Sequence, residues 1–101
     1  MVLGNPILLK HAPSTPLSAE ALEKLFHEAG FDEGEYANLF ITNEQSAKVI
    51  ADRRIRGVKF TGSTSGGMAV AAVAGSNMKP GCYELGGSDP FIVLNDSDIN
   101  L

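Results

Sequence analysis

Apolar residues in this chain occur either in short runs or at spacings typical of one helix face. The short runs indicate buried strands, which we expect at residues 7–10, 37–42, 58–61, 82–85 and 91–94. Turn-forming Gly, Pro and Asn residues separate most of these runs from the segments around them. The pattern therefore predicts short strands that alternate with helices along most of the chain.

The first two predicted helices have recognisable starts and ends. One begins with Pro16 at its first position and ends at Gly30, because proline favours a helix start and glycine a helix end. The other begins at a capping box formed by Thr42 and Gln45 and is broken by Gly57. The apolar face of the first helix has the spacing i, i+3, i+4, i+7 and consists of Leu22, Leu25, Phe26 and Ala29.

The third predicted helix, over residues 68–74, is rich in Ala and Val on nearly every side. A helix that is apolar all round is buried, either by its own domain or by a partner. Strands and helices in this alternating order predict an α/β fold with a mainly parallel sheet covered by helices. We expect a single, partial domain over residues 1–101, because no helix closes the sheet after residue 98.

Composition excludes several classes of protein. The net charge of −4 argues against a nucleic-acid surface, and the basic cluster at residues 53–56 fits a solvated helix end. No apolar run approaches the roughly 20 residues of a membrane helix, so we expect no membrane partner. The single cysteine excludes an internal disulfide and suits a reducing compartment, which predicts a cytoplasmic protein.

A glycine-rich turn follows the predicted strand at residues 58–61. Backbone N–H groups at such a turn, with a helix behind them, favour an anion such as phosphate. Gly62 and Gly67 have the glycine spacing of a P-loop, but Met68 and Ala69 replace its Lys and Ser or Thr, which excludes that NTPase motif. From local sequence alone, phosphate binding and a purely structural turn both stay open.

Glu84 is the candidate base, because a carboxylate at the end of a buried strand is costly without a partner or a function. The alternative is an exposed strand end. Lys10, at the end of the first strand, either reaches a ligand or is solvated. We expect Cys82 to be a small buried residue, and neither His11 nor His27 has companions at metal-ligand spacing, so no metal site is predicted.

Several motifs, taken together, resemble those of one known family. They are Gly4-Asn5 with Leu9-Lys10, Thr15-Pro16-Leu17, Phe60-Thr61-Gly62-Ser63-Thr64 with Gly67, and Glu84-Leu85-Gly86-Gly87. In this order and spacing the chain resembles the cofactor-binding domain of the aldehyde dehydrogenase superfamily. Residues 10–13 and 87–94 are most similar to the bacterial succinate-semialdehyde dehydrogenase branch.

The resemblance implies a partial Rossmann-like domain, with an open, mainly parallel sheet and flanking helices, that binds NAD or NADP. It implies that Glu84 is the general base that activates water to hydrolyse a thioester intermediate. The helix after the glycine turn would lie at a dimer interface, which predicts a homo-oligomer. The implied cofactor-binding residues are Lys10 at the adenosine ribose, Gly62, Ser63 and Gly67 at the pyrophosphate, and Leu85 and Gly86 at the nicotinamide.

The chain also departs from the family pattern. Pro13 stands where many NAD-preferring members have a ribose-binding glutamate, which makes NADP plausible. Cys82 does not match the family's nucleophilic cysteine, which would lie beyond Leu101. We therefore expect a fragment of an enzyme that oxidises succinate semialdehyde or a similar aldehyde, and expect the fragment alone to be inactive. The alternative is a non-catalytic nucleotide-binding or oligomerisation module.

Overall fold

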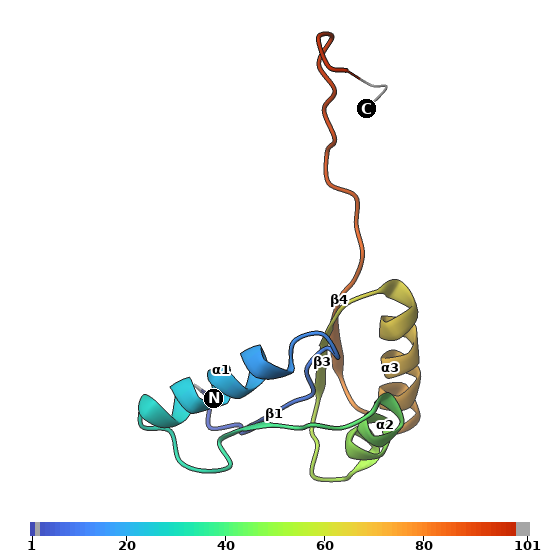
Figure 1. Ribbon diagram of the computed structural model, residues 1–101. Helices are drawn as coiled ribbons and strands as arrows, with labels where there is room; N and C mark the ends of the chain where they lie inside the picture. The colour runs from blue at the N-terminus through green and yellow to red at the C-terminus, as the bar shows by residue number, and fades with distance from the viewer. Residues whose placement is uncertain (2, 99–101) are drawn as a thin grey trace. The chain divides into compact units, whose positions relative to one another are not determined.

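The computed structural model describes residues 1 and 3–98, and the chain divides into two compact units, Met1–Asp52 and Arg53–Leu101 (Figure 1). The first unit contains β1 (Ile7–Leu9), α1 (Pro16–Glu28), β2 (Tyr36–Asn38) and α2 (Asn43–Ala51). The second contains β3 (Val58–Thr61), α3 (Thr64–Ser76) and β4 (Gly81–Glu84).

In the first unit, β1 and β2 form a parallel pair in the register Ile7↔Tyr36 to Leu9↔Asn38. Helix α1 packs on β2 through Phe26, whose ring stacks on that of Tyr36 at a centroid distance of 4.3 Å. The Asn38 backbone N–H also donates to Glu23 Oε1 at 3.1 Å. An aromatic stack and one charge-assisted hydrogen bond thus attach the helix to the strand pair.

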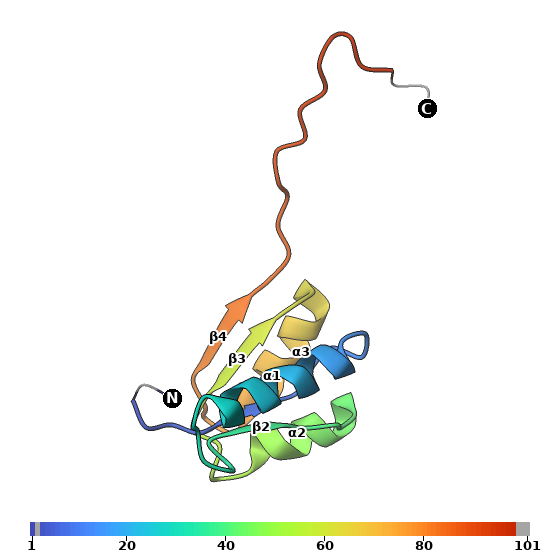
Figure 2. The same ribbon diagram turned by 60° about the vertical axis from the view of Figure 1, so that its left-hand side comes forward.

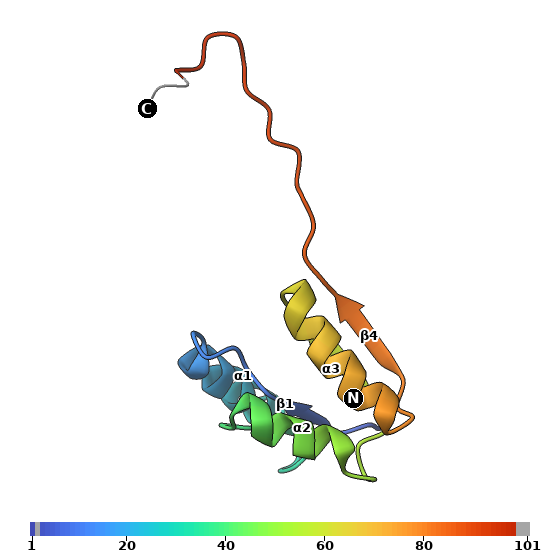
Figure 3. The ribbon, with the colours of Figure 1, turned by 90° about the vertical axis from the view of Figure 1, so that its right-hand side faces the viewer.

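In the second unit, β3 and β4 are also parallel, in the register Val58↔Gly81 to Thr61↔Glu84. Helix α3 connects them and lies along one face of the pair (Figures 2 and 3). Gly67 and Ala74 are the buried residues of this helix, and Ala74 is fully enclosed. The small side chains of α3 allow its backbone to approach the two strands closely.

The predicted α/β class is confirmed, since the described strands pair in parallel and helices connect them. Element boundaries differ from the prediction. Helix α2 ends at Ala51 rather than near Gly57, because Asp52 adopts an extended backbone. Strand β2 stops at Asn38, and helix α3 begins at Thr64, before its apolar stretch.

The predicted fifth strand, at residues 91–94, is wrong for this structure. These residues have no strand structure, and the side chains of Phe91 and Ile92 are 92% and 80% exposed. A strand requires a neighbour for its backbone hydrogen bonds, and no described strand pairs with this segment. Within the described residues, no helix has the length and apolar character needed to cross a membrane.

Candidate functional site

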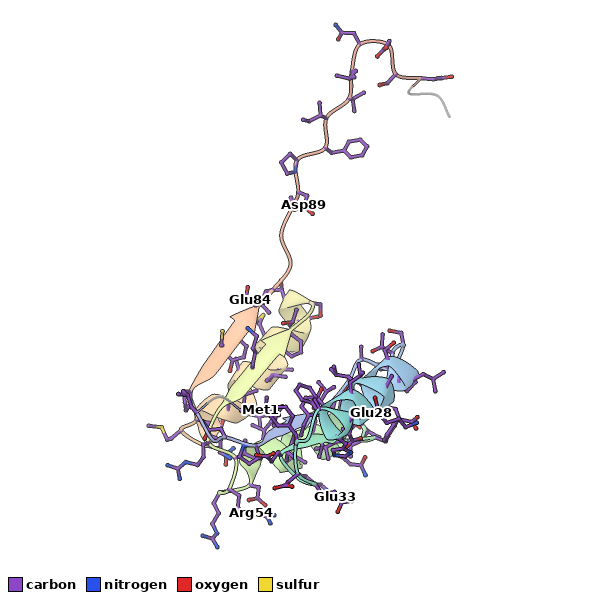
Figure 4. The ribbon with its side chains drawn as sticks, turned by 90° about the vertical axis from the view of Figure 1, so that its left-hand side faces the viewer. Met1, Glu28, Glu33, Arg54, Glu84 and Asp89 are labelled. Carbon is purple, nitrogen blue, oxygen red and sulfur yellow. The ribbon has the colours of Figure 1, made fainter. Side chains whose placement is uncertain are left out.

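The glycine-rich turn and Glu84 lie at the same edge of the second unit. Thr61 is the register partner of Glu84, and the Gly62 N–H donates to the Glu84 carbonyl oxygen at 3.0 Å. Figure 4 shows Glu84 where β4 ends. This is the carboxyl edge of two parallel strands, where open α/β sheets place their ligands.

Ser63 caps the start of α3 and leaves part of that start open. Its Oγ accepts a hydrogen bond from the Gly66 N–H at 3.2 Å, and its carbonyl oxygen accepts one from Gly67 at 2.9 Å. Among the described residues, the N–H groups of Thr64 and Ser65 donate to no protein acceptor. These donors lie at the positive end of a 13-residue helix, so they can bind an anion.

The glycines of the turn allow close contacts with two side chains. A Cβ added at Gly62 or Gly66 would lie 2.8 or 2.9 Å from Cζ of Phe60, so the ring occupies the space of a side chain at both positions. A Cβ at Gly67 would overlap Leu85. The Phe60 ring therefore supports the turn, a role that the sequence pattern alone does not indicate.

The residues after β4 approach the start of α3. Leu85 lies against Gly67, and a Cβ at Gly86 would lie 3.8 Å from Thr64 Oγ1. The predicted site residues of this unit therefore gather around one turn and the strand end beside it. They are Gly62, Ser63, Gly67, Glu84, Leu85 and Gly86.

Lys10, the other predicted site residue, belongs to the first unit and directly follows β1. It lines a pocket of about 380 Å³ together with His11, Pro13 and residues 41–44. The Thr42 hydroxyl and the Glu44 backbone N–H bond to the Glu44 carboxylate and lower the pKa of Glu44 below its ordinary value. The lining of the pocket thus includes a lysine and a glutamate from different elements. Spacing along the sequence did not reveal Glu44, because it comes from a different element than Lys10.

Cys82 is exposed, which corrects the prediction of a buried residue. It lies across the strand pair from Lys59, whose Nζ is 3.9 Å from the Cys82 Sγ. The two side chains point to the opposite face from those of Phe60 and Tyr83, as the strand alternation requires. Because α3 covers only the face with Phe60, Cys82 has no helix over it within this unit.

The two histidines do not form a metal site. His11 Nδ1 is 2.8 Å from the Ala12 carbonyl oxygen, and the His11 ring lies edge-on to Phe40. His27 is an exposed residue in the last turn of α1. Within residues 1 and 3–98, no group of three or more His, Cys, Asp or Glu side chains could hold a metal ion.

A parallel strand pair, a glycine turn at its carboxyl edge and an open helix start are features that α/β nucleotide-binding domains share. Comparison with protein families is more specific. Residues 1–101 match the model of the aldehyde dehydrogenase family, so the chain belongs to that family. The predicted resemblance is confirmed along the whole chain.

The chain is similar to the succinate-semialdehyde dehydrogenase [NADP(+)] of Deinococcus radiodurans, with 49% identity over 99% of this chain and 21% of the relative. It is 45% identical to the succinate semialdehyde dehydrogenase [NAD(P)+] Sad of Escherichia coli K12, over 100% of this chain and 22% of the relative. The chain therefore spans about a fifth of the length of the curated relatives it matches.

Solved structures agree with this assignment. The crystal structure of succinic semialdehyde dehydrogenase from Streptococcus pyogenes in complex with NADP+ has a TM-score of 0.86 and 48% identity, over 98% of this chain and 22% of that one. The similarity confirms the predicted fold class, a partial, Rossmann-like α/β arrangement.

Proposed function

We propose that this chain is the part of an NAD(P)-dependent aldehyde dehydrogenase that contains the pyrophosphate turn and the general base. The observation that carries this proposal is the backbone hydrogen bond from the Gly62 N–H to the Glu84 carbonyl oxygen. This bond joins the candidate anion-binding turn to the strand end that carries the candidate base. The names of the relatives support succinate semialdehyde, or a similar aldehyde, as the substrate of the whole enzyme.

The residues of the glycine turn fit the pyrophosphate group of a dinucleotide. The open Thr64 and Ser65 N–H groups can donate to a pyrophosphate, and the Phe60 ring packs against the turn at Gly62 and Gly66. Lys10 would contact the adenosine ribose, and Leu85 and Gly86 the nicotinamide end. When bound, NAD(P)+ supplies the hydride acceptor for aldehyde oxidation.

Glu84 would act as the general base. Its side chain is exposed at the end of β4, where water can reach the carboxylate. The carboxylate would take a proton from a water molecule as that water attacks a thioester carbon, and so would help to release the carboxylic acid. The single cysteine, Cys82, does not match the nucleophile position, so we propose that the chain alone does not oxidise aldehydes.

Titration calorimetry of the chain with NAD+ and NADP+ tests the cofactor site. We expect Ser63→Ala and Lys10→Ala each to weaken binding by about tenfold, since each removes a polar or charged contact. Ser76→Ala is the matched control, because Ser76 bonds to Ala72 at the other end of α3. Binding that is unaffected by Ser63→Ala, or production of NADH or NADPH from an aldehyde by the chain alone, would contradict the proposal.

A second candidate function is assembly through α3. Met68 is 68% exposed, and Ala72, one turn further along the helix, is also exposed. An apolar helix face left open in its own unit favours a homo-oligomer. Sedimentation measurements should show association that Met68→Glu weakens, and a monomer at all concentrations would exclude this candidate.

A further inference from the structure

Two aromatic rings lie on the face of the second strand pair that α3 covers. Phe60 on β3 and Tyr83 on β4 are register partners, so their side chains point to the same face. A Cβ added at Gly81 would overlap the Tyr83 ring, so this ring leans toward the start of β4. The Phe60 ring leans the other way, toward the glycine turn at the carboxyl edge.

The tip of the Phe60 ring contacts the glycine turn at two points. Its Cζ atom is the nearest atom to a Cβ added at Gly62, at 2.8 Å, and to one added at Gly66, at 2.9 Å. At Gly62 the three nearest atoms all belong to Phe60. A side chain at either position would require the ring or the turn to move, because these contacts are shorter than close packing permits.

The backbone between these two glycines contains the candidate anion donors. The N–H groups of Thr64 and Ser65 donate to no protein acceptor among the described residues. Donors that are held in place before an anion binds give a higher affinity, since less conformational freedom is lost on binding. A ring that contacts the turn on both sides of Thr64 and Ser65 can hold them in this way.

We infer that Phe60 is a positioning residue, whose ring holds the Thr64 and Ser65 N–H groups in the direction that a pyrophosphate requires. This inference rests on the proposed function, in which the turn binds the pyrophosphate of NAD(P). Phe60 acts through the backbone of the turn and not through a contact with the ligand. The size of its ring is matched to the absence of side chains at Gly62 and Gly66.

The first test measures the affinity for inorganic pyrophosphate by titration calorimetry. We expect Phe60→Leu, which removes the tip of the ring, to weaken binding by roughly three- to tenfold, because the turn loses its support. Phe60→Met keeps an apolar side chain long enough to reach both glycines and should retain most of the affinity. Tyr83→Leu is the matched control, because it removes a ring from the same face at the other end of the strands, and it should leave the affinity unchanged.

The second test crowds the ring instead of shortening it. Gly62 has no left-handed φ, so alanine can adopt its backbone conformation. Gly62→Ala places a methyl group against the Phe60 ring and should weaken pyrophosphate binding. Phe60→Leu makes room for that methyl group, so the double variant should bind at least as well as Gly62→Ala alone. A methyl group that obstructed the ligand directly would instead give losses that multiply in the double variant.

Nuclear magnetic resonance separates positioning from stability. In the free chain, Phe60→Leu should shift the amide resonances of Thr64 and Ser65, because the direction of these N–H groups changes. Tyr83→Leu should leave both resonances in place, even where urea denaturation shows that the two variants lose similar stability.

The outcomes separate the two proposals. An unchanged pyrophosphate affinity in Phe60→Leu, or in Gly62→Ala if Phe60→Leu does not fold, overturns the role of Phe60 and leaves the proposed function in place. Equal losses in Phe60→Leu and Tyr83→Leu, or losses that multiply in the double variant, have the same consequence. Absence of pyrophosphate binding by the unmodified chain overturns both proposals.

Discussion

Helices α2 and α3 both begin with a hydroxyl residue, yet the two starts differ in what they can bind. Thr42 caps α2 within a reciprocal capping box, and Glu44 adds an acidic side chain in the first turn. Ser63 caps α3 with a single bond to Gly66 N, and the first turn of α3 has no acidic residue. The start of α2 therefore has a reciprocal cap and a carboxylate of its own, and the start of α3 has neither.

Under the proposed function, a cap residue alone does not make an anion site. The residues after the cap make the difference. At α2 the side chains of Glu44 and Gln45 accept hydrogen bonds from backbone N–H groups. Gly66, at the position of α3 that matches Gln45, has no side chain to do so. Local sequence thus separates a helix start that only needs stabilisation from one that can bind a ligand.

Removing one backbone donor from α3 should have the largest effect. Thr64 is the first helical residue, where proline is well tolerated, and Ser63 already has the extended ψ of 153° that a following proline favours. Thr64→Pro should therefore keep the helix, remove one N–H, and weaken binding of inorganic pyrophosphate by roughly tenfold or more in titration calorimetry.

Two variants control this experiment. Thr64→Ala removes the hydroxyl but keeps the N–H, and should bind pyrophosphate almost as the unmodified chain does. Asn43→Pro makes the equivalent change at α2, after the extended Thr42, and should leave the affinity unchanged. Equal losses in the two proline variants would show that the starts of α2 and α3 do not differ as described.

Removal of the cap side chains should have a smaller effect, on helix stability. Here the larger loss should occur in α2 rather than in α3. Thr42→Ala removes the acceptor of the Gln45 N–H and the hydroxyl that bonds to the Glu44 carboxylate, and should destabilise α2 by about 1 kcal/mol. Ser63→Ala removes the bond to the Gly66 N–H and a contact between two exposed hydroxyls, those of Ser63 and Ser65, and should destabilise α3 by less. Amide hydrogen exchange resolves the two helices, and greater loss of protection in α3 than in α2 would contradict this expectation.

Much of the fold follows from local patterns. The capping box at Thr42, the proline start of α1 and the short strand β3 all form as predicted, because each depends on neighbouring residues. The segment 91–94 does not form the predicted strand, because its structure depends on a pairing partner. The prediction that Cys82 is buried is wrong for a similar reason, since burial depends on what covers its face of the strand.

The candidate site was predictable only in part. Gly62, Ser63 and Glu84 were identified from motifs, and the structure brings them together at one strand edge. Phe60 was not identified, because its contacts with the turn depend on how the ring folds back over Gly62. The pocket beside Lys10 was not predicted either, since its lining comes from two elements that only the fold brings together.

The smallest expected effect is the pH dependence of the start of α2. The pKa of Glu44 is lowered in the folded chain by the Thr42 hydroxyl and the Glu44 backbone N–H, so the ionised form is favoured on folding. This contribution is present above the ordinary carboxylate pKa of about 4.3 and is lost as the pH falls through the lower folded value. The Cα chemical shifts of α2 should therefore move toward coil values between roughly pH 5 and pH 3. Glu44→Gln should remove that change, and an equal pH response in the variant would show that another group controls this helix start.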